Sequence, residues 1–415
     1  MGPGTVHGLE WTVKELFVYP NEYIYWSIQI VMYPLMTGLV AGAFVLSSLY
    51  HVFGQKDLKD MANFSLVFSF ALLIVAPLPL LLHLQQPQRN MEVFLTPHFT
   101  SAISAFGIVF SVYFLIVAAE IWFVYRKFFV EQATVLKERE GAVNTIKRNI
   151  YRVLTLGAYD ISEEALRKDE KAAKILSGIG IPVACFLHGY AGFIFGSVKA
   201  NALWMTPLMP VIFIMSAIVS GIALCMLTYI VIVEWKKFRI RTSKTDLGLD
   251  ADRIGGVEIE LIKKTSKYLV GFMIAAVTLE ILDLIFRGYT AVKSWDILRS
   301  VIYERDFVSI FLFQYLLGYI VPFALLLTPK LTLRRVVAAT VLVIFGVFMM
   351  RWNVVIGGQA FSLTFAGYME YHLPIIPHNI ETLKEGLFGA LFVAVMPFIL
   401  FWGINKIVPS LRLEE

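Results

Sequence analysis

The sequence predicts an all-α polytopic membrane protein with about nine transmembrane helices. Hydrophobic residues make up 58% of the chain and charged residues only 16%, whereas a soluble domain carries about 25% charged residues. The apolar residues gather into nine long segments, and most basic residues lie between them. A soluble chain of this composition would expose large apolar patches to water. A soluble enzyme and a nucleic-acid-binding protein are therefore excluded.

Each of the nine segments is about as long as the roughly 20 residues that a helix needs to cross a bilayer. Backbone groups in lipid have to hydrogen-bond within their own element, so we expect these segments to be helices. They are residues 23–50, 62–84, 100–125, 175–197, 204–235, 268–290, 307–327, 336–357 and 386–408.

The distribution of Lys and Arg predicts the orientation of the chain. Of these 36 residues, 27 lie in alternate connections that end up on one side, and seven lie on the other side. Connections rich in Lys and Arg stay in the cytoplasm, so we place the N-terminus outside and the C-terminus inside. Residues 11–19 are too short to span, and their aromatic residues flank Lys14 and Glu15. This pattern is typical of an interfacial helix on the outer face.

The cysteine and histidine content limits the cofactors that the chain can hold. Cys185 and Cys225 both fall inside apolar segments, which excludes a disulfide scaffold and any metal or iron–sulfur site built from several thiolates. A membrane cytochrome needs paired axial ligands. Only His83 and His188 lie near a common depth inside the spans. The sequence therefore allows one haem with two histidine ligands but excludes two stacked haems.

Polar side chains gather at one depth in the first four helices. With the N-terminus outside, five of them belong to the outer halves of these helices: Gln29, Tyr33, His83, His98 and Tyr190. They come from distant segments yet reach one level, which predicts a polar pocket near the outer surface, with Arg89, His98 and His188 in supporting positions. The alternative is an interfacial belt, where such residues cost little.

His188 and Tyr190 lie two residues apart in one predicted helix. Residues with this spacing point about 200° away from one another, so both face one pocket only if the helix is distorted. We place Tyr190 on the ligand side and His188 in an interhelical hydrogen bond.

A second polar group lies in the predicted sixth and eighth helices. Glu280, Asp283 and Arg287 share one helix face because they are three and four residues apart, and Arg351 and Asn353 lie at a similar depth. The group is either a buried set of ion pairs between helices or a proton relay whose carboxylates change protonation.

Glu120 lies toward the inner end of the third predicted helix. We expect it either to feed protons from the inside to the outer pocket or to extend to water as an interfacial carboxylate.

Several local stretches carry a resemblance to a known family. They are Gly38–Gly42 in the first predicted helix, Leu82–Pro87 at the end of the second, Ser101–Gly107 at the start of the third, Gly180–Pro182 and His188–Gly192 in the fourth, and Pro207–Pro210 with Ser220 and Gly221 in the fifth. In combination they resemble the polysulfide reductase membrane-subunit family, the NrfD-type quinone-interacting subunits. Among larger relatives, the menaquinone reductase complex and alternative complex III look most similar.

The resemblance implies two four-helix bundles, here with one extra helix, and a quinone site at the outer face of the first bundle. The domain organisation that we expect is an outer segment 1–22, a first bundle 23–197 with an inner loop 126–174, a second bundle 198–357 with an inner loop 236–267, and a final part 358–415. By position, Tyr190 falls on the family's quinone-contacting tyrosine, and the region from Gln29 to Tyr33 falls on its other polar contacts. His83 departs from the family pattern, where an acidic residue often stands.

We therefore expect a quinone-reactive subunit of a respiratory oxidoreductase in a prokaryotic inner membrane, not catalytic by itself. It would bind no cofactor through its own ligands and would react with menaquinone or another quinone. An iron–sulfur protein on the outer face, further catalytic or cytochrome subunits and membrane lipid would be its partners, and nucleic acid would not. Two alternatives are a haem b-bearing membrane anchor and a secondary transporter, although the Pro and Gly breaks do not pair between halves as transporter repeats do.

Overall fold

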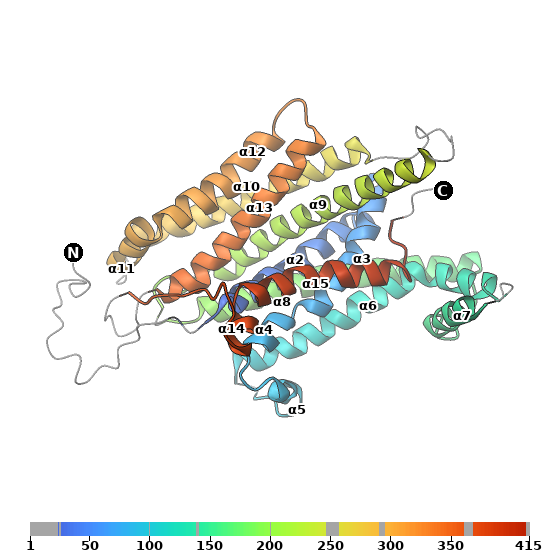
Figure 1. The fold of residues 1–415 in the computed structure, drawn as a ribbon, viewed down its shortest axis with the longest axis horizontal. Coiled ribbons are helices and arrows are strands. Elements are labelled where there is room, and N and C mark those ends of the chain that lie inside the picture. Colours follow the sequence, from blue (N-terminus) through green and yellow to red (C-terminus); the bar gives the residue numbers. More distant parts are fainter. Residues whose placement is uncertain are drawn as a thin grey trace.

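The described part of the chain is an elongated set of helices that run mostly along the long axis of the molecule (Figure 1). The computed structural model describes residues 24, 26–98, 100–137, 141–199, 201–245, 257–289, 295–360 and 368–411. Within these residues, nine helices are long and apolar enough to cross a membrane, which confirms the predicted fold class. The predicted interfacial helix at residues 11–19 lies outside the described residues, and the sidedness of the chain stays a prediction.

Four crossings make up the first half of the chain. Their helices are α2 (Ile28–His51), α3 (Lys59–Val75) with α4 (Leu78–His83), α6 (Ala102–Val135) and α8 (Glu163–Gly196). Ser27 begins α2 by accepting a hydrogen bond from the backbone N–H of Gln29, as a helix N-cap should. The second crossing is interrupted between α3 and α4 near Pro77, which has no N–H to continue the helical ladder.

The second half also contains four crossings, and parts of them are wound as π-helix. The elements are α9 (Met209–Thr245), α10 (Ile259–Tyr289), α11 (Trp295–Ser300) with η5 (Val301–Arg305), η6 (Val308–Ile320) with α12 (Val321–Leu326), and α13 (Leu333–Trp352) with η7 (Asn353–Gly357). The π-helical parts are η5, η6 and η7. Such segments are rare and occur often at functional sites.

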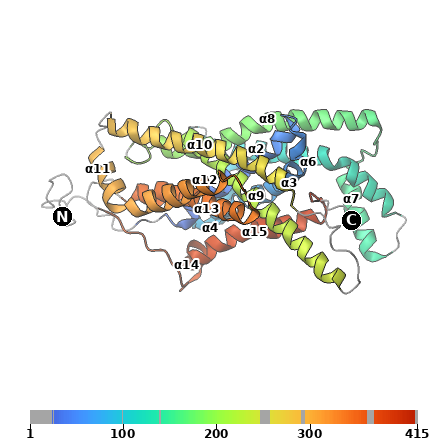
Figure 2. The same ribbon diagram turned by 90° about the horizontal axis from the view of Figure 1, so that it is seen from above.

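Short elements and the ninth crossing complete the chain. They are η2 (Lys56–Leu58), η3 (Pro87–Met91), α5 (Glu92–Leu95), α7 (Ala142–Leu154), α14 (Ile380–Glu385) and α15 (Leu387–Asn405). Helix α15 does not continue the second half, because it packs back against α3 and α2. Both views place α7 at one end of the molecule and α11 at the other (Figures 1 and 2).

Helix α9 joins the two halves of the chain. It packs against α2 and α8 of the first half and against α10 and α13 of the second, so the buried apolar residues of both halves form one continuous core. The crossing of α2 and α9 depends on Gly42 and Gly221: a Cβ on Gly42 would lie 2.8 Å from the Cα of Gly221. Small residues at such points let helix backbones approach closely.

The fifth crossing begins at Met209 rather than at residue 204 as the hydropathy predicts. The residues before it form a turn in which Asn201 accepts hydrogen bonds from the backbone N–H groups of Leu203 and Trp204. The Trp204 ring stacks on Trp26 at 5.4 Å between centroids. The apolar character of this segment therefore reflects packing at the helix end and not an earlier start of the helix.

Candidate functional site

A polar cluster lies where α2 begins, at the predicted outer end. We call it the outer cluster, and its members are Ser27, Gln29, His83, Tyr371 and Glu385. His83, the last residue of α4, has its Nδ1 atom 3.2 Å from the hydroxyl oxygen of Ser27. The same Nδ1 atom lies 3.4 Å from a carboxylate oxygen of Glu385, and both side chains are partly exposed. His83, predicted from the sequence, thus lies beside an acid that the sequence pattern did not single out.

Gln29 is fully buried in this cluster. Its side-chain N–H donates to the carbonyl oxygen of Lys384 at 2.6 Å. Its side-chain oxygen has no hydrogen-bond partner among the described residues. A buried acceptor left unsatisfied costs about 1–3 kcal/mol, so Gln29 Oε1 is suited to receive a hydrogen bond from a bound water or from a ligand hydroxyl.

The segment between η7 and α15 supplies the rest of the outer cluster. The hydroxyl oxygen of Tyr371 accepts a hydrogen bond from the backbone N–H of Ile28 at 2.9 Å, and burial raises the pKa of Tyr371 to about 12. Burial also raises the pKa of Glu385. The sequence pattern did not reveal either residue, because both lie far from His83 along the chain, in a connection without helical periodicity.

Below the outer cluster, one face of α2 carries a polar stripe. Gln29, Tyr33 and Thr37 are spaced four residues apart and therefore share that face. Tyr33 is buried, and its ring meets Phe106 edge to face at 5.5 Å. Thr37 lies deepest, and its hydroxyl is 3.3 Å from Nδ1 of His188. The stripe connects the outer cluster with the middle of the molecule.

His188 and Arg351 form a fully buried contact between the two halves of the chain. The guanidinium of Arg351 donates to Nε2 of His188 at 3.0 Å, to the hydroxyl of Ser216 at 2.7 Å and to the carbonyl oxygen of Phe213 at 3.3 Å. It also lies over the Phe213 ring, 3.8 Å from its centroid. Both ring nitrogens of His188 are engaged, so His188 is poorly placed to be an axial haem ligand.

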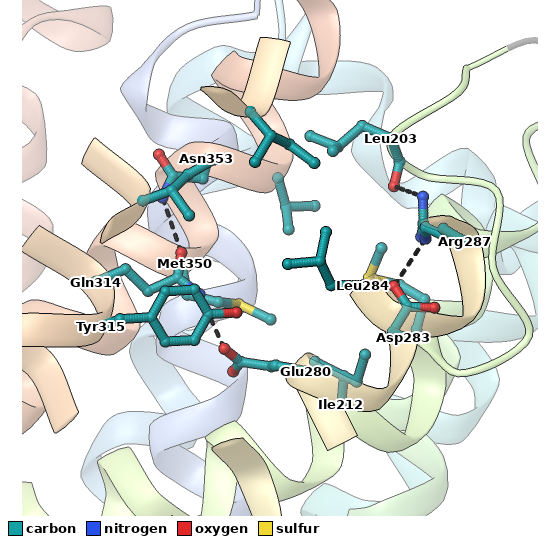
Figure 3. A pocket seen from close by; sticks show the side chains of 14 residues that line it. Leu203, Ile212, Glu280, Asp283, Leu284, Arg287, Gln314, Tyr315, Met350 and Asn353 are labelled. Atoms are coloured by element: carbon teal, nitrogen blue, oxygen red, sulfur yellow. Dashed lines mark hydrogen bonds and ion pairs between the residues drawn. The ribbon is translucent and has the colours of Figure 1, made fainter. Parts of the chain in front are cut away.

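The second polar group surrounds a cavity of about 120 Å³ between α10, η6 and α13. Its polar lining residues are Glu280, Asp283, Arg287, Gln314, Tyr315 and Asn353, and the remaining walls are apolar. In Figure 3, Gln314, Tyr315 and Asn353 lie on one side of the cavity, and Asp283 and Arg287 lie on the other. The π-helical segments η6 and η7 supply Gln314, Tyr315 and Asn353.

Glu280 is held by hydrogen bonds at the deep side of this cavity. Its two carboxylate oxygens accept from Nε2 of Gln314 and from the hydroxyl of Tyr319, each at 2.9 Å. The oxygen of Gln314 in turn accepts from the side-chain N–H of Asn353 at 2.8 Å, and Asn353 is hydrogen-bonded to Ser309. A continuous chain of side-chain hydrogen bonds therefore joins α10, η6 and η7.

Asp283 and Arg287 form a separate ion pair at 2.8 Å. Asp283 also accepts a hydrogen bond from Thr206, and Arg287 donates to the carbonyl oxygens of Ala202 and Leu203. This arrangement ties α10 to the turn before α9. Glu280, Asp283, Arg287 and Arg351 therefore do not form a single network of ion pairs. Arg351 donates to His188, Phe213 and Ser216 rather than to a carboxylate.

Glu120 is fully buried in α6, at the opposite end of the first half from the outer cluster. Neither of its carboxylate oxygens has a hydrogen-bond partner among the described residues. Nδ1 of His51, the last residue of α2, lies 3.8 Å from one of these oxygens. An acid buried in this way is stable when it is protonated or when it is reached by water.

For the remaining predicted site residues, the structure shows contacts within their own segments. Tyr190 packs between Phe186 and Phe193 of its own helix, and these two rings are exposed on the surface of the span. Arg89 forms an exposed ion pair with Glu92, and His98 lies 2.9 Å from the hydroxyl of Thr100. Their roles at a ligand site stay predictions.

Fold and site together define a class of protein: a polytopic all-α membrane protein with buried polar groups near one end and, within the described residues, an unsatisfied acceptor among them. The chain belongs to the family described as "Polysulphide reductase, NrfD", which it matches over residues 19–363. Tyr371, Glu385 and helix α15 lie beyond the matched region.

Curated relatives are named as subunits of reductases and of an oxidoreductase, and two of the names say membrane subunit. The chain is 34% identical to a selenate reductase subunit of Mesobacillus selenatarsenatis over 215 residues, which cover 50% of this chain and 49% of that protein. It is 25% identical over 358 residues to a putative dimethyl sulfoxide reductase membrane subunit of Halobacterium salinarum, covering 85% and 71% of the two chains. It is 23% identical over 413 residues to the Hdr-like menaquinol oxidoreductase integral membrane subunit of Archaeoglobus fulgidus, covering 94% and 87%. The alignment thus spans only about half of the selenate reductase subunit.

Proposed function

We propose that this chain is the quinone-reactive membrane subunit of a multi-subunit reductase complex. It exchanges electrons between a quinone in the membrane and an iron–sulfur partner subunit on the outer face. The observation that carries the proposal is the outer cluster, in which the buried oxygen of Gln29 lacks a donor among the described residues and a histidine lies nearby. The name of the Archaeoglobus relative contains menaquinol, so menaquinone is the quinone that we propose first.

The chemistry of a quinone explains the residues of this cluster. Oxidation of a quinol releases two electrons and two protons, so the site has to bind the ring, bond its oxygens and accept protons. A quinol hydroxyl donates to the free oxygen of Gln29. His83 exchanges the proton, because an imidazole changes protonation near neutral pH. The electrons pass to the partner, since thiolate ligands for a cluster are not available from Cys185 and Cys225, which are separate and lie inside spans.

Two further polar groups are proposed routes for protons. The stripe on α2 leads from Gln29 through Tyr33 to Thr37 and His188, and the carboxylate of Glu120 lies toward the opposite face beside His51. Across the contact of His188 with Arg351, the chain of hydrogen bonds at Glu280 extends the polar region into the second half. Buried ionisable residues in membrane spans are costly and commonly mark proton or ion pathways.

Pre-steady-state reduction tests the proposed function. Menadiol, a reduced naphthoquinone without an isoprenoid tail, is mixed anaerobically with the purified complex, and reduction of the iron–sulfur centres is followed optically. We expect His83→Gln to slow this reduction by about ten-fold or more, because an acid–base group is removed. The matched control is His378→Gln, which changes a histidine beyond the cluster. Equal rates in His83→Gln and wild type, with intact assembly, would contradict the site.

A further inference from the structure

The segment from residue 368 to residue 387 returns from the second half of the chain to the start of α2. It makes three hydrogen bonds there: from the N–H of Ile24 to the carbonyl of Glu370, from the N–H of Ile28 to the hydroxyl of Tyr371, and from Gln29 to the carbonyl of Lys384. This segment lies outside the region that matches the family. It is nevertheless built into the cluster that we propose as the quinone site.

Local structure fixes where this segment places Glu385. Helix α14 begins with a capping box in which Asn379 and Thr382 satisfy each other's backbone N–H groups. After the helix, the N–H of Leu387 donates to the carbonyl of Pro374 at 2.9 Å. Glu385 is the last residue of α14 and is therefore held between two fixed points, with its carboxylate toward α4.

The carboxylate of Glu385 faces one particular nitrogen of His83. Nδ1 lies 3.4 Å from Glu385 and 3.2 Å from Ser27. The hydroxyl oxygen of Ser27 also receives the N–H of Gln29 at 3.3 Å. Nε2 of His83 has no hydrogen-bond partner among the residues that the structure describes. An ionised carboxylate only accepts hydrogen bonds, so it favours the tautomer with the proton on Nδ1 and leaves Nε2 as the acceptor.

We propose that Glu385 is the positioning residue of His83: it holds the imidazole with Nδ1 protonated, so that Nε2 exchanges the proton of the quinol. This inference rests on the proposed function. It gives residues 368–387, which lie outside the region that matches the family, a part in the chemistry of the site. A carboxylate that orients a histidine and stabilises its charged form is a recurring arrangement in proteins.

The proton and electron balance of the step is simple. When the quinol is oxidised, an O–H bond breaks and its proton goes to Nε2 of His83. The two electrons pass to the iron–sulfur partner, and the second proton leaves to water. The imidazolium that forms lies against the carboxylate of Glu385. It then releases the Nε2 proton to solvent, which restores the tautomer with the proton on Nδ1. Quinone reduction follows the same path in reverse.

Three charged or titratable side chains surround Glu385 on the elements that the structure describes, besides Glu381. Lys384 and Glu381 on α14 act on it electrostatically, His83 faces it from α4, and Tyr371 lies in the same segment. Glu381 is exposed and has no contact with His83 in the described structure, so Glu381→Gln is a matched control for Glu385→Gln: both remove one acid from the same helix.

The test uses the assembled complex with menadiol as the reductant. For wild type, Glu385→Gln, Glu385→Asp and Glu381→Gln, the limiting rate of iron–sulfur reduction and the half-saturating menadiol concentration are measured between about pH 5 and pH 9, the range in which an imidazole titrates. We expect Glu385→Gln to lower the limiting rate by about ten-fold, as loss of a supporting group typically does, without changing the half-saturating concentration. The acidic limb of its pH profile should move to lower pH, because the imidazolium has lost its carboxylate partner. Glu385→Asp should recover part of the rate, and Glu381→Gln should match wild type.

The outcomes separate this inference from the proposed function. No reduction by menadiol in wild type overturns both. Reduction that His83→Gln slows but Glu385→Gln leaves unchanged in rate and pH profile overturns only the role of Glu385. If Glu385→Gln does not assemble, Glu385→Asp decides: a wild-type rate and profile in that variant means that the position of the carboxylate does not matter, and the inference fails.

Discussion

At the scale of single residues, the membrane-embedded charges of this chain have different surroundings. Arg287 and Asp283 are bonded to each other and to the turn before α9. In the described structure, Glu280 accepts hydrogen bonds from two neutral groups, Gln314 and Tyr319. Arg351 faces a histidine, a hydroxyl, a carbonyl and an aromatic ring. An ion pair with all its hydrogen bonds made is suited to holding helices together, whereas an acid among neutral partners is free to exchange a proton.

We predict that the pair of Asp283 and Arg287 is structural. Arg287→Ala leaves the half-buried carboxylate of Asp283 without its partner, and breaking a buried pair costs roughly 3–5 kcal/mol. The amount of folded protein and its thermal midpoint in detergent should therefore fall sharply. A second change, Asp283→Asn, should recover part of the loss because it removes the unpaired charge. Wild-type accumulation of Arg287→Ala would show that the pair does not stabilise the fold.

We predict that Glu280 serves proton movement. Glu280→Gln keeps the shape of the side chain and exchanges one acceptor for a donor, so it should cost about one hydrogen bond, or about 1 kcal/mol, and the complex should assemble. Charge movement across vesicle membranes during menadiol oxidation, followed with a potential-sensitive dye, should decrease. Undiminished charge movement in the assembled variant would remove Glu280 from the route.

At the scale of elements, two close helix crossings are each built on a pair of glycines, one between the two halves of the chain and one within the second half. Gly42 of α2 faces Gly221 of α9, and Gly318 of η6 faces Gly346 of α13. The first crossing brings α2, with its polar stripe, against α9, which carries Ser216 toward Arg351. The helix contact therefore places the polar groups of the site as well as the apolar core.

A matched pair of substitutions tests the importance of the α2–α9 crossing. Gly42→Ala puts a methyl group 2.8 Å from the Cα of Gly221, and such overpacking typically costs about 1–3 kcal/mol. Gly271→Ala, on α10, meets no atom within 4 Å and should be neutral or slightly stabilising, because Ala is the better helix former. Thermal unfolding in detergent measures both. Equal midpoints would indicate that α2 and α9 are not held at this distance.

At the scale of the whole molecule, the polar groups are sorted by end. The outer cluster lies at the start of α2, and the cavity of Figure 3 lies toward the end of α10, the start of η6 and the end of α13. Because successive crossings run in opposite directions, these helix ends all lie at the same end of the molecule. Glu120 and His51 lie toward the other end. The proposed function would require this separation: the quinone site and the groups that release protons lie at one end, and a group that takes up protons lies at the other.

Labelling from each side tests the predicted orientation. Lys199 and Lys147 are both exposed, and they lie toward opposite ends of the molecule's long axis, after α8 and in α7 respectively. In a protein from which Cys185 and Cys225 have been removed, a cysteine at position 199 should react with an impermeant maleimide added to whole cells. A cysteine at position 147 should react only after the cells are opened. The reverse pattern would place the outer cluster on the cytoplasmic face.

The amino-acid pattern alone was enough to predict the number, type and approximate limits of the crossings. Bilayer thickness and the need to satisfy backbone groups leave few alternatives for nine long apolar segments. The pattern also identified His83, Gln29, His188 and Glu280 as candidate functional residues, because polar side chains inside a membrane span are costly.

Which of these residues meet depends on the tertiary packing. His83 lies beside Glu385 and His188 beside Arg351 because of how the helices are rotated and packed, which hydropathy does not encode. The π-helical winding of η6 brings Gln314 and Tyr319 to Glu280, and an apolar sequence gives no sign of that winding. Partner choice depends on side-chain directions at helix crossings, and these are fixed by long-range packing rather than by local pattern.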